Sequence, residues 1–436
     1  MINQMSRRDF IRAAIAAGIA VPALGEPLLS AADTPAKKGP NEKLNLAIIG
    51  VANKGRHNLD QLTSENIVAL CDIDRNFLAQ ASKDFPSAKT MEDYRAVFDL
   101  PNLDGVVIST PDHMHAIPTL AALKRGLAVY CEKPLTHTVR EARLVREATV
   151  KHKCITQMGT QIHAGNNYRR VVELILQGAI GPVKRVHVWQ GNTVPACQRA
   201  AATAMPPDHV NYDLWIGPAP MRPFHTSHFH FQWRWWWDFG GGVLADMACH
   251  YVDLPFWALG LTAPTSVAAK GEKGHAGDND VPSRLQVDYK FPARENMPAV
   301  DLTWYHGGWQ PPGAEEYKLS SAVLFEGSEG RLLADYGSHK LFMQQGKEAR
   351  PVKQTIPNSV GHWKEWTDAI RAGTPNTTCR FEYGGMLTET ALLGNVSYRS
   401  GKPIEWKTES MSIPNEKDAE KFLSKEYRQG WELPTA

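Results

Sequence analysis

Long hydrophobic runs, strong net charge and paired cysteines are all missing from this 436-residue sequence. No stretch is long and apolar enough to cross a membrane, so no stable membrane anchor is expected. A net charge of +2 with no basic run gives no argument for a nucleic-acid partner. The six cysteines include no Cys-x-x-Cys pair, so they predict neither a zinc site nor a disulfide framework.

What is present is an ordinary globular composition, with 43% hydrophobic and 22% charged residues. The chain is also rich in tryptophan, with 13 residues, many of them in one stretch. This length predicts roughly two or three domains and a sizeable core.

The first residues carry a targeting pattern. Residues 6–11 read SRRDFI, a twin-arginine pattern, and the apolar run at 13–24 is too short to span a bilayer. We expect residues 1–32 to be a twin-arginine signal peptide and residues 33–42 a linker. The alternative is an amphipathic N-terminal helix. Because the twin-arginine route carries folded proteins, we expect a periplasmic or otherwise extracytoplasmic protein that holds its cofactor tightly.

A glycine turn then lies between two predicted strands. Residues 44–50 read as a buried strand that runs into the turn, and residues 67–72 form a second strand that ends in Asp72. Strand, glycine turn, helix, strand and acid is the dinucleotide-binding unit. Its helix N-terminus offers free N–H groups to a pyrophosphate. The expected cofactor contacts in this unit are Gly50, Ala52, Asn53, Lys54, Gly55 and Asp72.

The details of this turn bear on the choice of cofactor. Ala52 occupies the middle glycine position of the fingerprint, and its methyl group crowds the pyrophosphate unless the loop shifts. Asp72 is placed to accept from the adenine-ribose hydroxyls, which favours NAD over NADP. Arg75 just beyond it leaves some room for a 2′-phosphate.

The strand–helix pattern repeats up to about residue 160, so a Rossmann domain is predicted at 43–160. Ligands bind beyond the C-terminal ends of strands in such sheets. The residues expected there are Thr110, Pro111, His113, His115, Glu132 and Lys133. Lys133 is also placed to hydrogen-bond a substrate hydroxyl.

Residues 161–436 are predicted to form a second α/β domain, for substrate binding and oligomerisation. Alternating runs at 183–190, 283–291, 299–305 and 322–326 predict an open, mainly antiparallel sheet. Helices are expected at 167–177 and within 361–399, the latter packing beside the sheet or back on the first domain.

Three glycines at 240–242 open a predicted helix in this domain. Asp246 and His250 stand four apart and share one face, and Asp253 is expected to continue the same stripe. An imidazole flanked by carboxylates is a reasonable general acid/base. The alternative is a capped helix whose polar residues are only solvated or hydrogen-bonded.

An aromatic segment at 225–240 leads directly into this helix. Flat indole faces stack on pyranose rings, so the segment predicts a carbohydrate subsite, although tryptophans also fill cores. The expected substrate contacts are Tyr168, His228, Trp235, Trp236, Asp246 and His250, with Gln161 a weaker candidate. The pattern H-x-x-H-x-H at 225–230 invites a metal hypothesis, but no metal is expected because these histidines can hydrogen-bond a sugar.

Together these residues resemble the Gfo/Idh/MocA oxidoreductase family, named for glucose-fructose oxidoreductase and inositol dehydrogenase. The matching pieces are the turn from Gly50, the tripeptide at 132–134 (Glu-Lys-Pro), and the helix with Asp246 and His250. The likeness covers nearly the whole chain after the predicted signal peptide. Ala52 departs from the family pattern.

The resemblance implies a Rossmann domain followed by an α/β domain with a large open sheet, often in dimers or tetramers. It also implies that Lys133, Asp246 and His250 surround the substrate carbinol. The expected reaction is hydride transfer between a sugar or polyol secondary alcohol and a tightly bound nicotinamide cofactor. One alternative is redox-neutral cleavage of a glycoside by transient oxidation and elimination. Another, of a different class, is a non-catalytic sugar-binding protein.

Overall fold

The computed structural model describes residues 39, 42–199, 204–295 and 297–434. The predicted signal peptide at 1–32 lies outside these residues, as does the linker at 33–42 except for residues 39 and 42. None of the described helices is long and apolar enough to cross a membrane.

The first sheet has the strand order β3-β2-β1-β4-β5-β6, and all of its pairs are parallel. The strands are β1 (Asn45–Ile49), β2 (Asn66–Cys71), β3 (Lys89–Met91), β4 (Gly105–Ile108), β5 (Ala128–Cys131) and β6 (Thr156–Met158). Its helices are α2 (Lys54–Gln61), α3 (Arg75–Asp84), α4 (Ala116–Lys124) and α5 (Val139–His152). The order reverses direction at β1, which places the ligand crevice at the C-terminal ends of β1 and β4.

The second sheet has the order β13-β12-β11-β7-β10-β9-β8-β14. Its strands are β7 (Val183–Gln190), β8 (Ser266–Glu272), β9 (Arg284–Phe291), β10 (Val300–His306), β11 (Ala322–Gly327), β12 (Gly330–Ala334), β13 (His339–Met343) and β14 (Ile404–Glu405). Every pair is antiparallel except β7 with β10. The predicted fold class, a Rossmann domain followed by a domain with a large, mainly antiparallel sheet, is confirmed.

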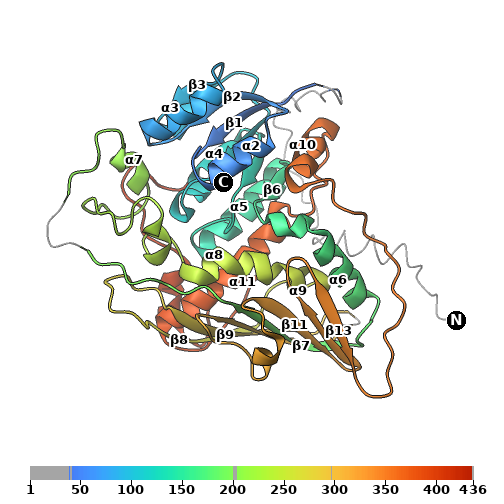
Figure 1. Ribbon diagram of the computed structural model, residues 1–436. Coiled ribbons are helices and arrows are strands. Elements are labelled where there is room, and N and C mark those ends of the chain that lie inside the picture. The colour runs from blue at the N-terminus through green and yellow to red at the C-terminus, as the bar shows by residue number, and fades with distance from the viewer. Residues whose placement is uncertain (1–38, 40–41, 200–203, 296, 435–436) are drawn as a thin grey trace, which may run out of the picture. The chain divides into compact units, whose positions relative to one another are not determined.

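Helices that follow the first sheet in the sequence lie between the two sheets (Figure 1). They are α6 (Asn166–Leu176), α8 (Gly242–Tyr251), α9 (Asp253–Ala258) and α11 (Phe381–Ser400). The long helix α11 packs on α5 from the first domain and on α8 and β8 from the second. Because α8 touches both β7 and β10, the open sheet fixes the position of the helix that carries Asp246 and His250.

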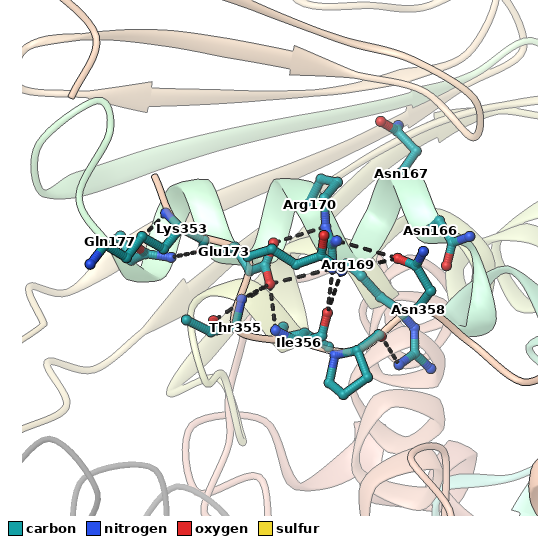
Figure 2. A network of polar contacts seen from close by, with 12 residues as sticks. Asn166, Asn167, Arg169, Arg170, Glu173, Gln177, Lys353, Thr355, Ile356 and Asn358 are labelled. Carbon is teal, nitrogen blue, oxygen red and sulfur yellow. Dashed lines mark hydrogen bonds and ion pairs between the residues drawn. The ribbon is translucent and has the colours of Figure 1, made fainter. Parts of the chain in front are cut away.

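Helix α10 (His362–Ala372) packs on the first domain rather than on the second sheet. Its Trp366 is fully buried, and a Cβ at Gly105 of β4 would lie 3.1 Å from that indole. Before α10, the extended segment at 353–358 runs alongside α6 (Figure 2). The buried carboxylate of Glu173 accepts hydrogen bonds from the N–H groups of Thr355 and Ile356. Satisfying this charge with backbone donors holds the segment against α6.

Candidate active site

A cleft of about 340 Å³ opens beyond the C-terminal ends of β1, β4 and β5. We call it the cofactor cleft. Most of the cofactor contacts predicted from the sequence line it: Gly50, Ala52, Asn53, Lys54, Asp72, Thr110, Pro111, His115, Glu132 and Lys133. His250 reaches the same cleft from α8, and Gln161 also lines it. Cofactor residues from one domain and a candidate base from the other therefore share one space.

The turn after β1 is built as a phosphate site requires. Gly50 has a φ of 86°, and a Cβ there would lie 2.7 Å from the Ser109 carbonyl oxygen. Asn53, which precedes α2, makes no side-chain cap hydrogen bond, and the N–H of Gly55 donates to the Ala52 carbonyl at 2.8 Å, so no side chain competes with an anion at the start of α2. Ala52 lies on the cleft without a positive φ, which is why a methyl group is accommodated in the turn itself.

Gly55 does not line the cleft, contrary to expectation. It is buried under the turn, where a Cβ would lie only 1.9 Å from the Gly50 carbonyl oxygen. Its role is to let α2 approach the turn closely, so it shapes the phosphate site without facing it.

A Gly55→Ala variant tests this close approach. The added methyl has to displace the Gly50 carbonyl, so we expect a loss of about 1–3 kcal/mol in the free energy of unfolding. We also expect at least tenfold weaker NAD binding, because the turn itself moves. Denaturant unfolding and cofactor titration measure the two effects. Gly337→Ala is the matched control, since the nearest atom to its added Cβ lies 3.9 Å away; equal effects in both variants would contradict the assignment.

Asp72 and Arg75 lie at the adenosine end predicted for the cleft. The Asp72 carboxylate accepts from the N–H of Val51 at 2.9 Å, and burial raises its pKa to about 6. Arg75 is already engaged, because it forms an ion pair with Glu92 at 3.6 Å and donates to the Asp208 carbonyl. Arg75, which could have bound the 2′-phosphate of NADP, is thus engaged by other groups, and this favours NAD over NADP.

A segment of the second domain covers this end of the cleft. The N–H of Asn211 donates to the carbonyl of Ile73 at 2.8 Å, and the N–H of Arg75 donates to the carbonyl of His209 at 2.9 Å. His230 adds a contact of 3.0 Å from its Nε2 to the Asp74 carboxylate. These contacts fasten residues 208–211 and His230 across the loop after β2.

Lys133 and Asp246 form a close pair between the domains. The Lys133 Nζ donates to Asp246 Oδ1 at 2.6 Å and to the Asp246 carbonyl oxygen at 2.7 Å. Burial acts to lower the pKa of Lys133, but the Asp246 carboxylate outweighs it and leaves that pKa above its usual value. Burial acts to raise the pKa of Asp246, whereas Lys133 and Arg234 bring it down to about 2. Both groups are therefore charged at neutral pH.

His250 differs from this pair in being neutral. Burial, followed by the nearby Lys133 ammonium, holds the pKa of His250 well below its usual value. Its buried Nδ1 has no hydrogen-bond partner among the described residues. A neutral imidazole with an unused ring nitrogen, one helical turn from Asp246, has the properties of a proton acceptor.

Asp253 does not continue the stripe of Asp246 and His250. Helix α8 ends at Tyr251 and α9 begins at Asp253, so Asp253 belongs to the next helix. The fully buried Asp253 carboxylate contacts His163 Nδ1 at 2.9 Å and accepts from the Tyr383 hydroxyl at 2.6 Å. It holds α9 in place and does not flank His250.

Several predicted ligand contacts are core residues instead. His113 is fully buried, with its Nε2 at 2.9 Å from the Trp215 carbonyl oxygen, and does not line the cleft. The Tyr168 hydroxyl donates to the carbonyl of His250 at 3.1 Å, so it supports α8 and does not face the cleft. His228 contacts the Tyr212 hydroxyl at 2.8 Å and stacks on Trp215.

The predicted tryptophan contacts also need correction. Trp236 is 1% exposed and donates to the Ser227 carbonyl, while Trp235 is buried and donates to Gln232. Neither lines the cleft; Trp233 and Arg234 do. The segment forms a 3-10 turn over Gln232–Trp235, so the sequence alone did not show which of its rings face the ligand.

The three histidines of the H-x-x-H-x-H pattern point to different partners. His225 contacts Ser227, His228 contacts Tyr212, and His230 contacts Asp74. In the part of the chain that the structure describes, no three His, Cys, Asp or Glu side chains are grouped to hold a metal ion.

Asp112 is a cleft residue that the sequence reasoning missed, although it directly follows the predicted contact Pro111. Its side chain is almost fully buried, and burial raises its pKa from 3.8 to about 8. The carboxyl is therefore mostly protonated at neutral pH and can donate a hydrogen bond into the cleft.

This raised pKa predicts a pH dependence of stability. The stabilisation linked to the protonated Asp112 is complete below about pH 4 and is lost as the pH rises through about 8. An Asp112→Asn variant keeps a neutral side chain, so its thermal midpoint should exceed that of the wild type near pH 8 and approach it near pH 4. Midpoints measured across this range check the sign. Asp418→Asn, at an exposed carboxylate, is the control and should leave the wild-type profile unchanged.

Comparison with known proteins agrees with this geometry. Residues 44–160 match the family model described as "Oxidoreductase family, NAD-binding Rossmann fold". Residues 183–433 match the model described as "Oxidoreductase family, C-terminal alpha/beta domain". The chain therefore belongs to the Gfo/Idh/MocA oxidoreductase family, and the cofactor of its first domain is NAD.

Among curated relatives, inositol 2-dehydrogenase 3 of Saccharopolyspora erythraea is 30% identical over 167 residues, 37% of this chain and 49% of that protein. Levoglucosan dehydrogenase of Pseudarthrobacter phenanthrenivorans is 27% identical over 198 residues, 44% of this chain and 42% of that protein. The chain thus spans about half the length of these relatives. The WlbA dehydrogenase of Bordetella pertussis, solved with NADH and UDP-GlcNAcA, shares the fold, with 17% identity, a TM-score of 0.61, and coverage of 84% of this chain and 99% of that one.

Proposed function

We propose that this protein transfers a hydride between a secondary alcohol of a sugar or polyol and a tightly bound NAD. The observation that carries the proposal is the meeting of a charged Lys133–Asp246 pair and a neutral His250 at the cleft that contains the phosphate turn. A dinucleotide fits this cleft, because its glycine turn admits no Cβ at Gly50 and no side chain caps the N-terminus of α2.

Each of the three side chains has a distinct task. His250, neutral in the folded protein, accepts the proton of the substrate hydroxyl. The Lys133 ammonium donates to the same oxygen and stabilises the charge that develops on it. Asp246 holds Lys133 in position and keeps it protonated. Bound NAD supplies the hydride acceptor.

The substrate class is supported by the cleft and by the relatives. The relatives are named as inositol and levoglucosan dehydrogenases, enzymes of a polyol and of a sugar derivative. In this chain Gln161, Arg234 and the protonated Asp112 bring hydrogen-bonding groups to the cleft, and Trp233 adds an aromatic side chain. Such a mixture of donors and aromatic surface suits a polyhydroxylated ring.

A second candidate is redox-neutral cleavage of a glycoside. Oxidation of one ring carbinol acidifies the neighbouring C–H, the aglycone leaves by elimination, and the hydride is returned at the end of the cycle. This chemistry requires that the cofactor stays bound throughout. The fastening of residues 208–211 and His230 over the loop after β2 favours such retention.

A chromogenic aryl-glycoside panel on the purified protein, with no added cofactor, separates these functions. Released aglycone and the absorbance of reduced nicotinamide are followed together. One equivalent of reduced nicotinamide without aglycone supports the dehydrogenase, which then needs a second substrate as acceptor. Many turnovers of aglycone without reduced nicotinamide establish the glycoside-cleaving candidate. If neither aglycone nor reduced nicotinamide is formed, also when free sugars and polyols are tested as substrates, a non-catalytic sugar-binding protein is favoured.

The proposed location is periplasmic or otherwise extracytoplasmic, reached in the folded state. The twin-arginine pattern at residues 6–11 supports this proposal. Fractionation of cells that express the full chain tests it, and replacement of Arg7 and Arg8 by Lys should retain the protein in the cytoplasm. A homo-oligomer, a dimer or tetramer, is likewise proposed from the family and is tested by light scattering of the purified protein.

A further inference from the structure

A second cavity, of about 310 Å³, lies apart from the cofactor cleft and shares no lining residue with it. Its walls come from the start of α5, the turn before α8, the C-terminal half of α11 and the segment at 421–426. Gly240 and Gly241, which lead into the helix of Asp246 and His250, form part of the wall. The oxidoreductase reaction proposed above uses none of these side chains.

Arg399 places a positively charged guanidinium at this cavity. Its guanidinium carbon lies 5.1 Å from the Trp237 ring centre and 4.4 Å from the Phe422 ring centre, and both rings line the cavity. Among the described residues the guanidinium forms no hydrogen bond or close ion pair, although the Asp238 and Asp280 carboxylates act on it electrostatically. Contacts with two aromatic faces restrict the side chain while its N–H donors stay available. A planar, restricted guanidinium is suited to bidentate binding of a carboxylate.

Asn395 supplies an unused acceptor one helical turn before Arg399. Its side chain is 6% exposed, and its Nδ2 donates to the Gly241 carbonyl oxygen at 2.9 Å. This contact fixes the orientation of the amide, which leaves Oδ1 buried without a partner among the described residues. A buried acceptor without a donor is costly, and a ligand hydroxyl would satisfy it.

The charges around the cavity favour a singly charged anion. Arg399, Lys421 and Lys425 line it together with Asp238 and Glu426. Asp238 is paired with Arg222, and Lys425 contacts Glu141 at 3.0 Å. Lys421 and Arg399 are both exposed, but Lys421 contacts one ring, that of Phe422, whereas Arg399 contacts two rings of the cavity. Arg399 is therefore the cation best placed for a ligand, while Glu426 opposes a more highly charged one.

We propose that this cavity binds a small hydroxylated carboxylate of the sugar-acid class. The carboxylate lies on Arg399 and a hydroxyl donates to Asn395 Oδ1. These two residues are four apart on α11 and therefore share one face of the helix.

Isothermal titration of the full chain, as isolated with its cofactor, tests the site with D-gluconate and D-glucuronate, and with sorbitol as the neutral probe. We expect both acids to bind and sorbitol to fail. Arg399→Gln should weaken the acids at least tenfold, and Arg399→Lys should weaken them less. Arg331→Gln, at an arginine stacked on Phe342 in the second sheet, is the matched control and should bind as the wild type does.

Acids that bind at the substrate site instead would give a different pattern. In that case Lys133→Met would abolish binding and Arg399→Gln would leave it intact, which overturns the proposal. Lack of binding to the wild type, or equal binding of sorbitol, also overturns it. Thermal unfolding of each variant shows whether it folds. A loss of binding is then not confused with a loss of folded protein.

Discussion

Replacement of His250 by Ala should lower turnover roughly 10²- to 10⁴-fold while NAD remains bound. The imidazole is neutral in the folded protein, has an unused ring nitrogen and lies at the cofactor cleft, so its removal takes away the proton acceptor. The Tyr168 hydroxyl bonds to the backbone carbonyl of residue 250, and this support of α8 is unaffected by the substitution. Steady-state kinetics and the ratio of bound nucleotide to protein measure the two quantities.

His339→Ala is the matched control for this variant. His339 is an exposed histidine of the second domain, with its Nδ1 at 2.7 Å from Asn167 Oδ1, and it lies outside the cofactor cleft. Its removal should leave turnover within about twofold of the wild type. Unchanged turnover in His250→Ala would exclude His250 from the mechanism, whereas loss of NAD from that variant would assign it a binding role.

Replacement of Lys133 by Met should abolish turnover and also destabilise the fold, by about 3 kcal/mol in the free energy of unfolding. The Lys133 and Asp246 side chains are 11% and 21% exposed, so removal of the ammonium leaves the Asp246 carboxylate poorly solvated. Arg234, with its Nε at 3.5 Å from Asp246, compensates only in part. Denaturant unfolding at neutral pH measures the loss.

The double variant Lys133→Met/Asp246→Asn separates the two effects. It removes the unpaired charge, so stability should largely recover while turnover stays lost. Lys364→Met provides the comparison with an exposed pair, since Lys364 and Asp368 are 61% and 44% exposed. It should cost less than about 1 kcal/mol. A single Lys133→Met variant as stable as Lys364→Met would show that the interdomain pair has no special energetic role.

The residues that local pattern predicted well are those on regular elements. The strand at 67–72 and its terminal acid were found because buried parallel strands are short apolar runs bounded by turns. Asp246 and His250 both lie within α8, where a spacing of four defines a shared face, as the pattern predicted. The prediction failed at Asp253, two residues beyond the end of the same helix, because its carboxylate is held by His163 and Tyr383, which lie far from it in the sequence.

The aromatic segment shows the opposite case. Trp233, Trp235 and Trp236 are chemically alike, and no period in the sequence separates a ring that faces the cleft from a ring in the core. The 3-10 turn over Gln232–Trp235 decides it, and no periodicity in the sequence predicts that turn. The raised pKa of Asp112 has the same origin, since the burial that causes it comes from the packing of two domains.

The sequence by itself therefore determined the two-domain fold class and the NAD-binding turn, because both depend on local spacing and residue type. It also indicated the three side chains that we propose for the chemistry. Only the tertiary structure decided that Lys133 of one domain pairs with Asp246 of the other, and that Arg75 is engaged by Glu92 and Asp208. It also decided that Arg399 and Asn395 line a second cavity. Contacts between distant segments set burial, charge pairing and cavity shape. Local sequence patterns do not predict these contacts.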